Sequence, residues 1–197
     1  MTDVTTTALP APRPVRPRTT LVAALFVAAG ALVGFFGLVA LYVARRAQAL
    51  NAGQDWFDAD AVELGPPGFI FATLILSVFT VQWAVHATRH DDRVNAYWAL
   101  AITGLFGAAV FNQLWFILAE TGFSVDGGEA EFLFLVVNGY FAVMLIAAVA
   151  TLAITFLRAL AGQYTGKQND GVAAAALFWN AVVAVWAVTW YVIYITK

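Results

Sequence analysis

The stretch LVAALFVAAGALVGFFGLVALYVA, residues Leu21–Ala44, decides the fold because it carries no charged residue along its whole length. A helix needs about 20 apolar residues, rising about 1.5 Å each, to cross a hydrocarbon core of about 30 Å. This stretch therefore predicts a membrane-spanning helix. It is too long for a signal peptide and Arg45 and Arg46 follow it directly, so we expect it to be retained.

Four further apolar runs of spanning length lie at Gly68–His86, Val94–Ala119, Phe132–Leu157 and Gly171–Ile195. The chain is 62% hydrophobic and 11% charged, whereas soluble domains are about half apolar and a quarter charged. The sequence thus predicts an all-α, polytopic bundle of five transmembrane helices over residues 21–197. Residues 1–20 are rich in proline, threonine and arginine, and we expect a disordered tail there.

Charge asymmetry orients the chain, because basic residues concentrate on the cytoplasmic side of a membrane protein. The amino-terminal tail and the second and fourth loops hold seven basic residues: Arg13, Arg16, Arg18, Arg89, Arg93, Arg158 and Lys167. The other side holds three basic residues and most of the acidic ones. We therefore expect a cytoplasmic amino terminus, and a net charge of −2 gives no reason to expect a nucleic-acid partner.

His86 and His90, the two histidines of the chain, fall one helical turn apart at the end of the second run. Two residues on one helix cannot clasp a haem from both sides. A metal would need Asp91 and Asp92 as further ligands, since a zinc site usually has three or four protein ligands that converge on the ion. We favour a solvated helix end over a ligand site. The chain contains no cysteine, so thiolate and iron–sulfur sites are excluded.

The central parts of the five runs contain no Asp, Glu, Lys or Arg, which argues against a pump or a proton-coupled carrier. The five runs also contain side-chain amides, for which we favour hydrogen bonding between helices over a substrate site. These are Asn112, Gln113, Asn138 and Asn180. Gly30, Gly34 and Gly37 form a seam on which another helix can pack closely; Gly104, Gly107 and Ala108 form a second. Aromatic anchors at the membrane interfaces are expected at Trp56, Phe57, Trp115 and Phe116 on one side, and at Tyr97 and Trp98 on the other.

The order of these motifs resembles subunit III of haem–copper terminal oxidases (cytochrome c oxidase and quinol oxidase), in the short five-helix bacterial form. The first helix ends FFGLVALYVARRAQ, and the second follows a proline pair in LGPPGFIFATLILSVFTVQWAVHATRHDD. The fourth contains FLVVNGYFAVMLIAAVATLAITFLRALAGQYT and the fifth ALFWNAVVAVWAVTWYVIYI. The resemblance covers about residues 20–197.

The resemblance implies a subunit without a redox centre, in the bacterial cytoplasmic membrane, which packs on subunits I and II. It also implies phospholipid enclosed between helices, support of proton uptake and lasting turnover, and membership of a larger respiratory supercomplex. Haem and copper are expected in the partner subunits and no cofactor or metal in this chain.

The chain departs from the family pattern where the family carries ionisable residues in the membrane. The glutamate of the first helix falls near Ala31, and the two histidines of the fourth at Phe141 and Met144. A histidine and an aspartate of the fifth become Asn180 and Val183. The family positions that remain are Gly139, Trp179 and Trp186.

Three other functions stay open on the sequence alone. An accessory membrane subunit of a nitric oxide reductase shares the scaffold, and co-purifying proteins would separate it from an oxidase subunit. A free-standing small transporter is disfavoured because no inverted repeat or buried charge appears. A haem-bearing membrane anchor is disfavoured by the histidine count.

The absence of native cysteine makes the orientation directly testable. Single cysteines placed at Thr7 and Thr165 should be shielded from an impermeant thiol reagent in intact cells, while one at Gly127 should react. Labelling of Thr7→Cys from outside the cell would reverse the orientation.

Overall fold

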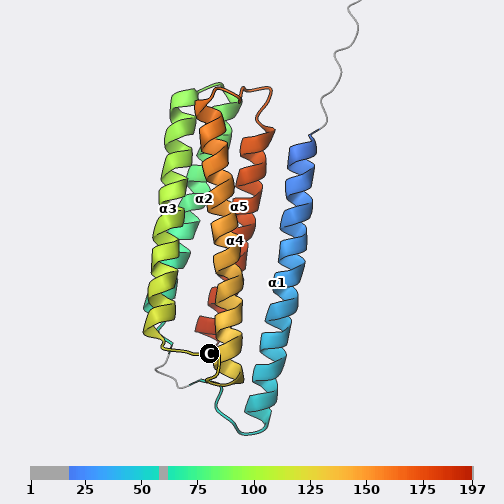
Figure 1. Cartoon of the computed structure of the whole chain (residues 1–197), viewed down its shortest axis with the longest axis vertical. Coiled ribbons are helices and arrows are strands. Elements are labelled where there is room, and N and C mark those ends of the chain that lie inside the picture. Colours follow the sequence, from blue (N-terminus) through green and yellow to red (C-terminus); the bar gives the residue numbers. More distant parts are fainter. Residues whose placement is uncertain (1–17, 58–61, 197) are drawn as a thin grey trace, which may run out of the picture.

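The computed structural model describes residues 18–57 and 62–196, and in these ranges the chain forms five long helices (Figure 1). They are α1 (Thr19–Asn51), α2 (Gly65–Arg89), α3 (Arg93–Glu120), α4 (Glu129–Leu160) and α5 (Asp170–Thr189). A π-helical turn, η1 (Trp190–Ile195), continues α5. All five are long and apolar enough to cross a membrane, so the predicted multi-pass all-α bundle is confirmed.

The helices extend past the apolar runs that predicted them, because polar flanks continue the backbone hydrogen bonding of each helix. α1, for example, runs through Arg45 and Arg46 to Asn51. Of the expected tail, residues 1–17 lie outside the described residues, and α1 begins at Thr19.

The bundle has a basic end and an acidic end. The basic end is where α1 begins; among the described residues it carries five basic residues, Arg18, Arg89, Arg93, Arg158 and Lys167, and three carboxylates, Asp91, Asp92 and Asp170. The acidic end carries Arg45 and Arg46 together with these carboxylates of the described chain: Asp55, Glu63, Glu120, Asp126, Glu129 and Glu131. Basic residues therefore gather at one end of the bundle and most acidic residues at the other, which is the pattern from which the orientation was predicted.

α5 is the central element of the bundle and packs on α1, α2 and α4, while α3 packs on α2 and α4 (Figure 1). Most residues of α5 are buried, whereas α1 buries only Ala28, Phe35 and Tyr42. α1 is accordingly the outermost helix, with most of its surface free of contact with the rest of the described chain.

Two buried tryptophans attach α5 to α2. The Nε1–H of Trp179 donates to Ser77 Oγ at 2.9 Å, and that of Trp186 donates to the carbonyl of Pro67 at 3.3 Å. Both indoles are fully buried. A buried indole contributes a large apolar area and one donor that needs a partner, so each tryptophan sets both the depth and the rotation of α5 against α2.

The amides only partly follow the prediction of hydrogen bonds between helices. Tyr194 donates to Asn138 Oδ1 at 3.1 Å, which ties η1 to α4, and Gln113 donates to the carbonyl of Pro66 at 3.4 Å. The prediction is confirmed at these two positions. Asn180 Oδ1 is buried without a partner among the described residues, and Asn112 is exposed on α3.

The aromatic anchors need one correction. Trp98, Trp115 and Phe116 are exposed, as interface anchors should be. Trp56 was expected with them, but it is buried against α1, where its Nε1–H donates to Tyr42 Oη at 3.0 Å. The hydrogen bond and the T-shaped ring contact outweigh the interfacial preference of the indole, so Trp56 closes the acidic end of the bundle.

Gly107 makes the tightest glycine contact between two long helices of the bundle, and Gly104, one turn away, is its natural control. A Cβ at Gly107 would lie 2.7 Å from Val149 Cγ2 and 3.0 Å from the Trp179 ring, whereas one at Gly104 would meet nothing within 4 Å. We predict that Gly107→Ala lowers the free energy of unfolding by roughly 1–3 kcal/mol through overpacking. Gly104→Ala should be neutral or stabilising, because alanine is the better helix former. Thermal unfolding in detergent, followed by circular dichroism, measures both; equal melting temperatures would contradict the packing of α3 on α4 and α5.

Candidate functional site: a cleft between α1 and the α4–α5 pair

The clearest candidate site is a cleft at the basic end, where α1 meets α4, α5 and the loop between them. Its outer part, here called the basic mouth, has a volume of about 820 Å³. Its inner part, the apolar slot, has a volume of about 360 Å³ and runs along the helices toward the membrane centre. Thr20, Arg158, Tyr164 and Gly171 line both parts, so the two are continuous.

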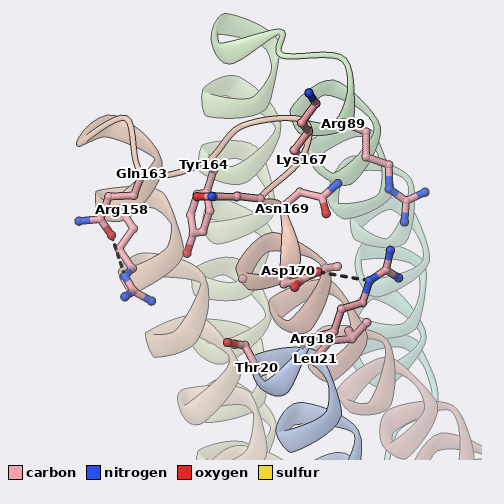
Figure 2. A pocket seen from close by; sticks show the side chains of 14 residues that line it. Arg18, Thr20, Leu21, Arg89, Arg158, Gln163, Tyr164, Lys167, Asn169 and Asp170 are labelled. Carbon is pink, nitrogen blue, oxygen red and sulfur yellow. Dashed lines mark hydrogen bonds and ion pairs between the residues drawn. The ribbon is translucent and has the colours of Figure 1, made fainter. Parts of the chain in front are cut away.

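The basic mouth carries four cationic side chains and one carboxylate (Figure 2). Arg18 lies 3.9 Å from Asp170, and Arg158 Nε donates to Gln163 Oε1 at 3.1 Å. Arg89 and Lys167 make no ion pair with any described residue. The mouth therefore has an excess of positive charge, supplied by side chains from α1, α2, α4 and the α4–α5 loop.

The α4–α5 loop is held in place by the neighbouring α2–α3 turn. Asp91 Oδ1 accepts a hydrogen bond from the backbone N–H of Gly166 at 2.6 Å. Gly166 lies so close that a Cβ there would come within 2.7 Å of the carbonyl oxygen of Arg89. Only glycine fits this approach, and the contact sets the position of Lys167 beside Arg89.

The apolar slot is lined by small and aliphatic side chains of three helices. α1 contributes Ala23, Ala24 and Val27; α4 contributes Ala147, Thr151 and Ile154; α5 contributes Ala174, Ala175 and Phe178. Further toward the acidic end, Tyr140 of α4 donates to the carbonyl of Ala31 at 2.7 Å. This bond brings α4 and α1 into direct contact, so the gap between the two helices closes at this point.

The predicted glycine seam lies along this part of α1. A Cβ at Gly34 would lie 3.1 Å from Tyr140 Oη, so Gly34 provides the space for the tyrosine hydroxyl. Gly30 and Gly37 have no described atom within 4 Å of that position. A helix contact along the whole seam stays a prediction, with Gly34 as the position already in contact inside the chain.

His86 and His90 lie next to each other on the exposed end of α2, with ring centroids 4.2 Å apart. The two carboxylates that could complete a metal site form hydrogen bonds with other residues instead. Asp91 holds Gly166, and Asp92 caps α3 by accepting from the backbone and the side chain of Asn95. The Asn95 bonds lower the pKa of Asp92. Within the described chain, no group of three or more His, Asp or Glu side chains is placed to hold a metal.

The positions matched to ionisable family residues lie in the packed interior or at the cleft. Phe141 packs on Trp186 with ring centroids 4.5 Å apart, and Met144 and Val183 are buried. Gly139 is half-buried, with no described atom within 4 Å of a Cβ position. At Phe141, Met144 and Val183 apolar packing replaces the ionisable groups that the resemblance implies, whereas Asn180 keeps a polar side chain.

Sequence reasoning did not find the cleft, because its lining comes from three helices and a loop. One signal was available: Arg158 and Lys167 lie on either side of Tyr164 in the sequence, on the predicted side of the membrane that also holds Arg18. Tyr140, which ends the separation of α1 and α4, could not be distinguished from the other aromatic residues of the fourth run.

Comparison with known proteins agrees with this architecture. The family model described as cytochrome c oxidase subunit III matches residues 14–197. Cytochrome c oxidase subunit 3 of Loxodonta africana is 29% identical over 164 residues, that of Xenopus laevis 29% over 165, and that of Oncorhynchus mykiss 30% over 165. Each match covers 82% of this chain but only 62% of the relative. Five membrane-crossing helices and a family match over nearly the whole chain place this multi-pass membrane protein in the cytochrome c oxidase subunit III family.

Proposed function

We propose that the chain is a non-catalytic, supporting subunit III of a respiratory haem–copper terminal oxidase, and that it binds phospholipid in the cleft. In this proposal it packs beside subunits I and II, which hold haem and copper, in the bacterial cytoplasmic membrane with its amino terminus in the cytoplasm. The complex would join a larger respiratory supercomplex. Family membership supports the assignment to an oxidase, and the relatives named above are oxidase subunits.

The observation that carries the lipid proposal is the basic mouth above the apolar slot. A phospholipid has an anionic phosphate joined to acyl chains, and the cleft offers cations and apolar side chains in that order. Arginine and lysine near a membrane surface attract anionic headgroups, and arginine can form charge-assisted hydrogen bonds with phosphate oxygens. Arg89 and Lys167, which have no ion-pair partner among the described residues, are the residues best placed to do so.

The gap between α1 and α4 is about as long as the acyl chain of one leaflet, and the slot lines it on α1 from Thr20 to Val27. From Thr20 at the mouth to Ala31, where Tyr140 closes the gap, α1 rises roughly 16 Å at about 1.5 Å per residue. Half of a hydrocarbon core is about 15 Å. A lipid with its phosphate in the mouth would therefore extend to the middle of the bilayer and meet Tyr140 there.

In this role the chain acts through position and packing. Its central spans carry no acid or base, and Phe141, Met144 and Val183 fill the places where the family has ionisable groups. The chain would then sustain proton-coupled electron transfer to oxygen indirectly, by holding lipid and a neighbouring subunit in place through many turnovers.

The double variant Arg89→Gln, Lys167→Gln tests the proposal. Each cation near a membrane surface contributes about fivefold to the binding of an anionic lipid, so we expect roughly 25-fold weaker retention of anionic phospholipid. Lipid extracted from the purified complex and quantified by mass spectrometry gives the content, and oxygen consumption over successive turnovers should decline faster than in the wild type.

Arg45→Gln at the acidic end is the matched control, since Arg45 lies 3.4 Å from Glu129 and outside the cleft. It should leave unchanged both the lipid content and the rate at which activity is lost over successive turnovers. An unchanged content of anionic lipid in the double variant would refute the lipid site.

A further inference from the structure

The outer face of α3 carries a polar side chain that a lipid environment explains poorly. We define this α3 outer face by Leu105, Ala108, Ala109, Asn112 and Trp115, all of which are exposed. The opposite side of the same helix carries Thr103, Gly107, Val110 and Leu114, which are buried against the other helices. The α3 outer face therefore points away from the bundle.

Asn112 lies at hydrocarbon depth on this face. The 28 residues of α3 extend over about 42 Å, which leaves about 6 Å at each end outside a core of about 30 Å. Asn112 is about 12 Å from the end of the helix at Glu120, so it lies roughly 6 Å inside the core. Its Cα–Cβ bond tilts toward the start of the helix, away from the nearer headgroups and deeper into the membrane.

The amide of Asn112 makes no hydrogen bond with any described residue. Hydrocarbon offers no donor or acceptor, so an amide left there is costly unless another helix supplies a partner. The outward residues of α1 and α4 are different in kind: Phe26, Val33, Val143 and Ile146 are exposed and purely apolar. The unsatisfied amide distinguishes α3 from these two faces.

We propose that the α3 outer face docks against a membrane-spanning helix of a partner subunit, with Asn112 hydrogen-bonded to a polar group of that helix. Ala108 and Ala109 have small side chains that let a second backbone come close, and Leu105 and Trp115, each 69% exposed, would pack along its flanks. The proposal rests on the proposed function only in that the oxidase complex supplies the partner.

Photo-crosslinking in the assembled complex tests the contact, with α4 as control. Leu105 and Val143 are 69% and 68% exposed near the middle of their helices, so a photoreactive amino acid at either site reports its neighbour at similar depth. We expect Leu105 to yield an adduct whose crosslinked peptide lies in a membrane span of another subunit, and Val143 to yield lipid adducts. Lipid adducts alone at Leu105, or a protein adduct at Val143 with none at Leu105, would overturn the proposal.

Substitution of the amide gives a second, independent measurement. Asn112→Leu should weaken retention of the partner in detergent by about 3- to 30-fold, the range for one hydrogen bond between membrane helices. Asn112→Gln keeps the amide and should restore most of the retention. Equal retention in wild type and Asn112→Leu would refute a role for the amide. A crosslinked partner complex without haem would refute the proposed function while leaving the docking face intact.

Discussion

The attachment of α5 to α2 by two buried indoles is the constraint on which the rest of the bundle depends. Trp179 and Trp186 have no exposed surface, and each has one donor that must find an acceptor. Once Ser77 and the carbonyl of Pro67 accept these bonds, the depth of α5 is set, and the faces it presents to α1 and α4 follow. Gly107 is then favoured as glycine, because Val149 and the Trp179 ring both approach the place that a side chain would occupy.

The cleft is a consequence of this central position of α5. α1 packs mainly on α5 and reaches α4 through Tyr140, so the two outer helices separate between that bond and the basic end. The separation places a hollow lined by alanine, valine and isoleucine beneath cationic side chains. An amphipathic cavity of this kind needs no dedicated binding motif, since it follows from where two helices meet and where they part.

The sequence predicted the five spans and the separation of charge between the two ends, because length, composition and charge are properties of single segments. It could not predict which side of each helix is buried. In a membrane the lipid-facing and core-facing sides of a helix are both apolar, so periodicity is weak and the exposure of Asn112 leaves no signal. The sequence could not predict the cleft for a related reason: Thr20, Arg158 and Tyr164 come together only through the packing on α5.

The account describes a subunit that supports chemistry carried out elsewhere, and removal of the chain from the complex tests that claim most directly. The comparison is between complexes purified with and without this chain, by haem absorption spectrum, initial rate of oxygen consumption and activity over successive turnovers. The account predicts an unchanged spectrum, a largely intact initial rate and a faster loss of activity. Loss of the haem signal or of the initial rate at the first turnover would contradict it.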